Sequence, residues 1–184
     1  MIKIAEILTE VAAHASELYK KDYNSKAQPI NFIADNFLIV GQELIKLGKN
    51  ANAAKGKYPA ILVFMDQVVE RSAPALKQWE AEATLPTILI VTDAVQGNGT
   101  EKLNKVYYPI LYPIAECFFD AIEAHPQIFT KGDFAPKRER FDRMNLVAVM
   151  GASIALPDKL DGIEIRNLRL YLKEKKCFTN LKKL

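Results

Sequence analysis

The sequence is poor in the residues that build disulfide-rich and metal-binding domains. Of 184 residues only two are cysteines, Cys117 and Cys177, and their wide separation fits no metal-ligand or redox spacing. Cys117 stands next to Phe118 in an apolar segment and is most simply a core thiol. Cys177 lies in a Lys-rich stretch with no neighbouring residue to act as its base. The cysteines therefore indicate no disulfide framework and favour a reducing compartment.

Neither sign of charge dominates, and no long apolar run occurs. There are 25 Lys+Arg and 22 Asp+Glu residues, for a formal net charge of +3, whereas nucleic-acid-binding domains usually show a strong basic excess. No apolar run approaches the roughly 18 residues expected of a membrane-spanning helix. Glu6 and Glu10 interrupt the apolar pattern near the N-terminus, so this segment is not typical of a signal peptide.

The chain does contain enough apolar material for one core. Hydrophobic residues make up 49% of it and charged residues 26%, as is typical of a globular domain, and its length suits one domain. We therefore predict a single α+β domain over residues 1–184. Within it we expect an N-terminal helix at 3–20, a core at 36–172 and a basic C-terminal tail at 173–184.

Two segments have the period of an amphipathic helix. Near the N-terminus, apolar residues recur at three- and four-residue steps: Ile4, Ile7, Leu8, Val11, Ala15 and Leu18. A longer pattern covers 103–122, but Pro109 and Pro113 lie inside it. Because proline removes a helical hydrogen bond and clashes with the preceding turn, we predict a kink, or two helical pieces that meet near Tyr112.

Four apolar segments predict strands. These are AILVFM from Ala60, TILIVTD from Thr87, MNLVAVMGASIAL from Met144 and DGIEIRNLRLYL from Asp161. The last segment alternates between apolar and polar positions, and its phase slips by one at Asn167, which suggests a bulge. Residues 31–40 are apolar without a clear period and fit either a strand or a helix. The whole pattern predicts a single antiparallel or mixed sheet of about four strands, with helices packed on one face.

A glycine-containing loop and several carboxylates are candidates for chemistry. The loop GNGTEK at 97–102 lacks the spacing of both glycine motifs that bind phosphates, so its glycines are interpreted as turn residues. Asp66 and Asp93 each follow a predicted strand, where α/β enzymes often carry catalytic groups. A small cytoplasmic α/β enzyme that uses these strand-end carboxylates therefore stays an alternative. A third group, which lacks calcium-loop spacing, is interpreted as a solvated turn before a strand: Asp158, Asp161 and Glu164.

The remaining candidates are two histidines and a basic loop. His14 and His125 have no cysteine or second histidine nearby in the sequence, so a zinc site is not predicted. The loop at 131–140 combines lysines and arginines with Phe134 but also contains acidic residues, and this mixture favours a protein-contact role over nucleic-acid binding. We predict no catalytic, cofactor-binding or metal-binding residue and no cofactor, which leaves a protein-interaction module as a further alternative.

Four segments, taken in chain order, share motifs with a family of phage proteins. They cover 41–65, 85–93, 101–122 and 160–178. Their shared features are a Tyr-Pro pair before the first strand, a second apolar strand, a Tyr-Pro-Ile helix and a last strand reading D-x-I-E-I-x-N-L. The chain resembles the tail-terminator and head–tail joining (neck) proteins of tailed bacteriophages, as found in crAss-like and other Bacteroidetes phages.

The resemblance implies a structural virion protein and not an enzyme. It implies a tail-terminator-like α+β subunit that assembles into a ring, commonly hexameric, and joins the tail tube to the portal or connector. The expected partners are copies of the chain itself and the tail-tube and portal proteins, with DNA only as content that passes through the lumen and with no membrane. The expected location is the virion tail or neck, after assembly in the host cytoplasm.

Overall fold

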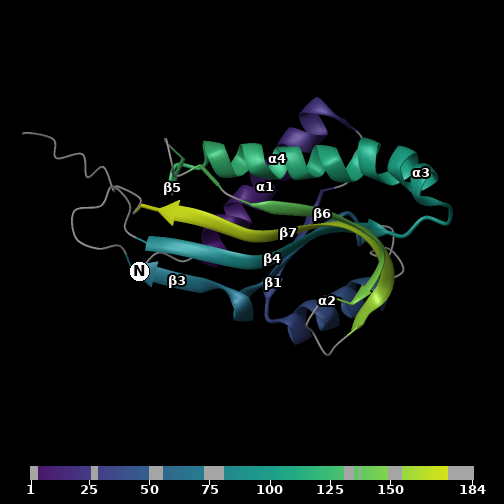
Figure 1. Ribbon diagram of the computed structural model, residues 1–184, viewed down its shortest axis with the longest axis horizontal. Coiled ribbons are helices and arrows are strands. Elements are labelled where there is room, and N and C mark those ends of the chain that lie inside the picture. The colour runs from purple at the N-terminus through teal and green to yellow at the C-terminus, as the bar shows by residue number, and fades with distance from the viewer. Residues whose placement is uncertain are drawn as a thin grey trace, which may run out of the picture.

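The computed structural model of the protein describes residues 4–25, 29–49, 56–72, 81–130, 135–136, 138–148 and 155–173, which form a curled sheet with helices against it (Figure 1). The helical segments are α1 (Ile4–Asp22), α2 (Phe37–Lys49), η2 (Met65–Gln67), α3 (Gly99–Lys102), η3 (Leu103–Leu111) and α4 (Tyr112–Ala124). The strands are β1 (Asn31–Asp35), β2 (Ala60–Phe64), β3 (Val69–Ser72), β4 (Ala81–Asp93), β5 (Ile128–Phe129), β6 (Glu139–Ala148) and β7 (Ala155–Leu172). The predicted α+β class is confirmed.

The strands form one mixed sheet in the order β1-β2-β4-β7-β5. β2 and β3 pair with the same side of β4, one after the other along it, and β5 and β6 do the same along β7. The seven strands therefore occupy five positions across the sheet. β1 and β2 are parallel, and the other pairs are antiparallel. The predicted number of about four strands was too low, because β1, β3 and β5 are only five, four and two residues long and leave little pattern in the sequence.

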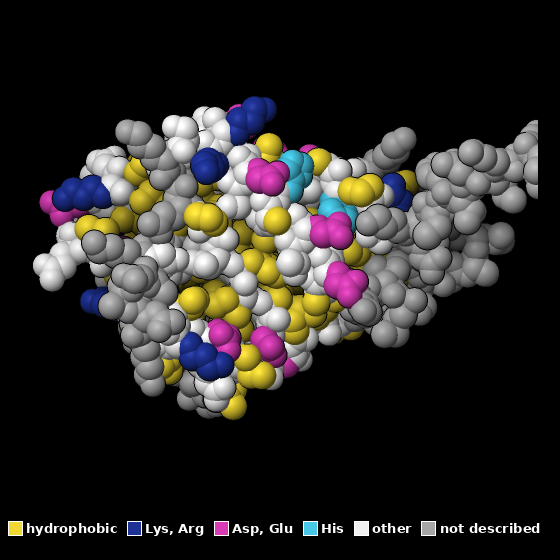
Figure 2. Space-filling model, turned by 180° about the vertical axis from the view of Figure 1, so that it is seen from behind, with side chains coloured by type: hydrophobic (Ala, Val, Ile, Leu, Met, Phe, Trp, Pro, Cys, Tyr) yellow, Lys and Arg dark blue, Asp and Glu magenta, His cyan; other side chains and the backbone are white. Residues whose placement is uncertain are grey.

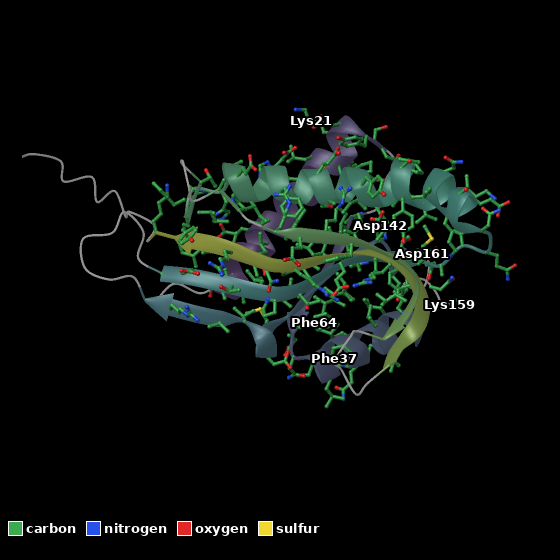
Figure 3. All side chains as sticks on the ribbon, in the orientation of Figure 1. Lys21, Phe37, Phe64, Asp142, Lys159 and Asp161 are labelled. Atoms are coloured by element: carbon green, nitrogen blue, oxygen red, sulfur yellow. The ribbon has the colours of Figure 1, made fainter. Side chains whose placement is uncertain are left out.

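Helices cover both faces of the sheet, not one face as the sequence pattern predicted. α1 and α4 lie on one face, where Tyr107 and Phe118 belong to the larger apolar core. α2 lies on the opposite face within the bend of β7 (Figure 1) and forms a second core. There Phe37 of α2 and Phe64 of β2 point toward each other, with ring centroids 5.1 Å apart (Figure 3). The error arose at residues 31–40, whose ambiguous period reflects a strand followed directly by a helix.

The long helical pattern divides near Tyr112 as predicted. α3 continues into η3, a π-helical stretch, and α4 begins at Tyr112, whose backbone N–H donates to the carbonyl oxygen of Tyr107. Pro109 lies inside the π-helical stretch, and Pro113 is the second residue of α4, where it has no N–H to donate to the preceding turn. The N-terminal helix also has the predicted inner face, with these residues buried: Ile4, Ile7, Leu8, Val11, Ala12, Ala15 and Tyr19.

In the two central strands, β4 and β7, the alternation of inward- and outward-facing side chains shifts by one residue, and the two shifts lie opposite each other in the sheet. In β7 the residues that face the larger core are Ile163 and Ile165 before the slip, and Leu168, Leu170 and Leu172 after it. Asn167, at the slip, has a φ of 54°. Opposite it in β4 is Pro86, which has no N–H to give to the ladder. The predicted slip is confirmed, but the β4–β7 register is the same on both sides of it, so the predicted bulge in this pairing is wrong.

Parts of the predicted organisation differ at their boundaries. α1 ends at Asp22, two residues beyond the predicted end, and β1 precedes the predicted start of the core at residue 36. The tail from residue 174, with Cys177, lies outside the described residues, as does most of the basic loop, with Phe134. In the part of the chain that the structure describes, no helix has both the length and the apolar character needed to cross a bilayer.

Candidate functional site: buried ion pairs and open sheet edges

The most deeply buried ion pair joins Lys102, at the end of α3, to Asp161 on β7. The two residues are 2% and 0% exposed, and the Lys102 Nζ lies 2.8 and 2.7 Å from the carboxylate oxygens. Asn145 of β6 accepts from Lys102 at 3.0 Å and donates its backbone N–H to Asp161 at 2.9 Å. The Val95 N–H donates to the other carboxylate oxygen at 3.1 Å. These bonds connect α3, β6, β7 and the loop after β4, which is a structural role.

Tyr107 extends this buried group toward the larger core. Its hydroxyl donates to the carbonyl oxygen of Gly162 at 3.3 Å. Burial raises the pKa of Tyr107 far above its ordinary value, and the nearby carboxylate of Asp161 raises it further. The hydroxyl therefore stays protonated at physiological pH and acts only as a hydrogen-bond donor.

The glycine-containing loop at 97–102 forms a helix cap. The Asn98 Oδ1 accepts from the Glu101 N–H at 3.0 Å, and the Glu101 Oε2 accepts from the Asn98 N–H at 3.1 Å, which is a capping box. Gly97 has a φ of 143°, and a Cβ there would collide with Glu101. Gly97 is therefore a turn residue, as interpreted, whereas Gly99 is the first residue of α3. The Lys102 ammonium group points inward to the Asp161 carboxylate.

The two strand-end aspartates do not lie together. Asp93 ends β4, whereas Asp66 lies in η2 after β2, and both are exposed. β2 and β4 are antiparallel, and Val63 pairs with Ile88, five positions before Asp93. Since Asp66 lies on the far side of Val63, the two carboxylates are at least about 17 Å apart along the strands. They belong to no common site, which removes the geometry on which the enzyme alternative depended.

The predicted solvated turn at Asp158, Asp161 and Glu164 is wrong, because all three residues belong to β7. Glu164 is 4% exposed and accepts from the Nε of Arg143 at 2.5 Å and from the Nε of Arg166 at 2.6 Å. Burial raises the pKa of Glu164, but the hydrogen bonds and charges of the two arginines outweigh it and hold the pKa below its ordinary value. The alternation of β7 carried the missed signal, since Glu164 and Arg166 are two positions apart and share a face.

β6 forms one edge of the sheet, and on its helix side Arg140 of β6 and Arg138, just before it, lie against aromatic rings. The Arg138 guanidinium lies 3.3 Å from the ring centroid of Phe119, and that of Arg140 lies 4.7 Å from the ring of Tyr112. The Tyr112 hydroxyl donates to Asp142 at 2.6 Å. Burial and this bond raise the pKa of Tyr112 to about 12. The side chains of β6 are therefore held in place on a surface that solvent reaches.

The opposite side of the same strand exposes apolar groups. Phe141 lies between the guanidinium groups of Arg143 and Arg166, at 5.1 and 4.9 Å from its centroid. Phe141 is 36% exposed. Met144 is 37% exposed, but it lies near Gly99 of α3, on the helix side of β6. Exposed apolar residues on an edge strand are typical of a surface that binds another protein.

β1 forms the other edge of the sheet and borders a groove. The groove lies between β1 and α2, has a volume of about 340 Å³ and includes Phe32, Ile33 and Leu47 in its lining. Every residue of β1 is half-buried, and within the described residues β1 pairs only with β2. The other side of the β1 backbone, which an added strand would use, has no strand partner in the described part of the chain.

The two histidines and Cys117 lie on α1, on α4 or directly after α4. The Nε2 of His125 lies 3.1 Å from the Oε2 of Glu10, and its Nδ1 accepts from the Gln127 N–H at 3.2 Å. His14 is exposed on α1. Cys117 is a buried free thiol, and burial raises its pKa to about 11. The sequence interpretation of Cys117 as a core thiol is confirmed.

Among the residues that the structure describes, no three His, Cys, Asp or Glu side chains are grouped so that they could hold a metal ion. Comparison of the chain with models of known protein families, with curated proteins and with solved structures finds no match. The functional argument therefore depends on the surfaces described above and on the resemblance seen in the sequence.

Proposed function

We propose that the protein is a non-enzymatic structural subunit that assembles with copies of itself into a closed ring, as a tail-terminator or neck component between the tail tube and the portal of a phage virion. One observation carries the proposal. Each buried charged side chain in the described part of the chain is engaged by a protein group, whereas β1 and β6, the outer strands of the sheet, each pair on one side only among those residues. The buried charges therefore serve the fold, and we propose that the exposed surfaces of the protein act by binding other protein subunits.

The two open edges are different surfaces, and this favours a ring. A contact between unlike surfaces of identical subunits repeats from copy to copy, and it closes into a ring when the rotation between neighbours allows it. β1 lies at one edge and β6 at the other. Hydrophobic side chains also reach the surface across the middle of the face shown in Figure 2, between a small number of charged groups. In the proposed ring, DNA is only the content of the lumen.

The oligomeric state of the purified chain tests the proposal. Light scattering and negative-stain electron microscopy should show one closed ring, and this ring should bind purified tail tubes or portal complexes. A particle that stays monomeric at every concentration reached, and that binds neither tail tubes nor portals, would contradict the proposal. A monomer that binds some other protein would favour the alternative of an interaction module.

A further inference from the structure

The groove beside β1 has the features of a site for an extended segment. Its floor is an open sheet edge, its lining includes Phe32, Ile33 and Leu47, and the two charged residues in its lining, Asp35 and Glu43, are both acidic. Lys46 neutralises Glu43 through an ion pair at 2.5 Å, so the net negative charge of the lining comes from Asp35. A strand that is added to an edge gains backbone hydrogen bonds, and side-chain pockets select which sequence binds. The best fit is therefore an extended, partly apolar segment with basic residues.

The chain itself contains such a segment at 174–184, which lies outside the described residues. Its sequence, EKKCFTNLKKL, has four lysines against one glutamate, and its apolar residues include Phe178 and Leu181. These two residues are three positions apart and so fall on opposite faces of a strand. β1 likewise has apolar residues on both faces, since Phe32 packs on the larger core and Ile33 on the second core. Charge and apolar pattern thus both match the groove.

The register of the sheet places this groove beyond the reach of the same copy's segment. β7 ends at Leu172, which pairs with Ala81. Ala34 of β1 pairs with Val63 of β2, and Val63 pairs with Ile88 of β4. Ile88 is seven positions after Ala81, so β1 lies across the sheet from this point of β4. Seven residues along β4 and three inter-strand steps across the sheet separate the two points by about 28 Å.

The chain that must bridge this distance runs from Leu172 to the first residue that pairs along β1. If the paired residues include Phe178 and Leu181, that first residue is at the latest Phe178, six positions after Leu172. Six residues span at most about 21 Å when extended, which is too short for a distance of about 28 Å. A segment that pairs along β1 must therefore come from another copy.

We infer that the groove between β1 and α2 of one copy binds the C-terminal segment 174–184 of a second copy as an added strand. This inference rests on the proposed ring and specifies the contact that joins neighbours in it. The contact joins unlike surfaces, because the end of β7 in one copy supplies the segment and the far edge of the sheet in the next copy receives it. The acidic lining of the groove attracts the lysines, and the apolar residues replace water along β1.

Cysteine crosslinking between two populations of the full chain tests the inference. One population carries Leu47→Cys, in the groove, together with Cys177→Ser, and the other keeps the natural Cys177. After mixing, a short bismaleimide should join the two populations into a covalent heterodimer, while the buried Cys117 stays unreacted in both. The matched control is Leu38→Cys with Cys177→Ser, because Leu38 is on the same helix, is 52% exposed and does not line the groove. This control should give no heterodimer.

A second variant separates a specific contact from chance collision. Replacing Phe178 and Leu181 by Asp in the Cys177 population should abolish the heterodimer while leaving each chain folded. Crosslinking within one chain in a Leu47→Cys variant that retains Cys177, without dimers, would overturn the inference. So would the absence of any heterodimer in a preparation that still forms rings, an outcome that leaves the proposed function standing. A chain that forms no ring at all but still crosslinks would contradict the proposed function and leave this contact intact.

Discussion

Gly162 lies where β7 passes closest to β4. A Cβ at this position would lie 2.9 Å from the Val91 Cγ1 and 3.0 Å from the carbonyl oxygen of Ile90. The backbone oxygen belongs to a paired strand and cannot move away cheaply. We therefore expect Gly162→Ala to lower the free energy of unfolding by about 1–3 kcal/mol, as overpacking of a core does.

The matched control for this change is Gly41→Ala in α2. A Cβ there meets nothing within 4 Å, and alanine has a higher helix propensity than glycine, so this variant should gain about 1 kcal/mol. Chemical denaturation of both variants measures the two effects. If the two variants changed the free energy of unfolding by the same amount and with the same sign, the close approach of β7 to β4 would not be the reason for glycine at position 162.

The buried pair of Lys102 and Asp161 gives a second prediction for single residues. Asp161→Asn keeps the shape of the side chain but leaves the ammonium group of Lys102 buried without its anion. Breaking one side of a buried ion pair costs about 3–5 kcal/mol, and we expect a loss of this size in denaturant unfolding. Asp120→Asn, at an exposed position of α4, should change stability little. A small loss for both variants would mean that water reaches Lys102 easily.

The ribbon formed by β6 and β7 depends on Glu164 in a way that pH can reveal. Arg143 of β6 and Arg166 of β7 hold the pKa of Glu164 below its ordinary value of 4.5. The carboxylate therefore stabilises the fold at pH values above that ordinary value, and this contribution disappears as the pH falls through the lowered folded-state pKa. Thermal unfolding of the wild type and Glu164→Gln should differ most near neutral pH, with the wild type more stable, and the two should converge in acid.

An unchanged difference between these two proteins from neutral pH to acid would contradict this assignment. Glu43→Gln is a suitable control, because Glu43 pairs with Lys46 on an exposed part of α2. Exposed pairs contribute little to stability, so its unfolding profile should follow the wild type at all pH values.

At the level of helices and strands, the sequence predicted the features that a long periodic pattern shows. It did not predict the features that depend on contacts between distant parts of the chain. The inner faces of α1, the division of the long helix at Tyr112 and the slip at Asn167 each leave a local pattern. The second core under α2 does not, since its residues come from strands and a helix far apart in the chain. The buried carboxylate of Asp161 was missed for the same reason, because its partner Lys102 is far away in the sequence.

The candidate site shows the same division. An exposed edge cannot be predicted until the order of the strands is known, and this order depends on the pairing of β7 with both β4 and β6. The basic character of 173–184 was visible from composition alone. Its fit to an acidic groove became apparent only when β1 and α2 were seen to border that groove.

For the molecule as a whole, the question is whether α1 is a fixed layer or a part that separates during assembly. Cys117 reports on this directly, because it lies in the core that α1 and α4 share, and the charge of Asp22 on α1 also influences it. Burial raises its pKa from 9.0 to about 11, so the reactive thiolate is roughly 100-fold scarcer than for an ordinary cysteine, besides being inaccessible. In a Cys177→Ser chain, we expect a thiol reagent to label Cys117 only when the protein unfolds.

The denaturant dependence of the labelling rate gives the size of the opening that exposes Cys117. If labelling requires global unfolding, its free energy should equal that from equilibrium denaturation, and α1 would then stay on the sheet in the proposed ring. A lower free energy with a weak denaturant dependence would mean that α1 detaches alone. The apolar face that α1 now covers would then become available to a neighbouring subunit, and the ring contact would have to be sought there in addition to the edge formed by β1.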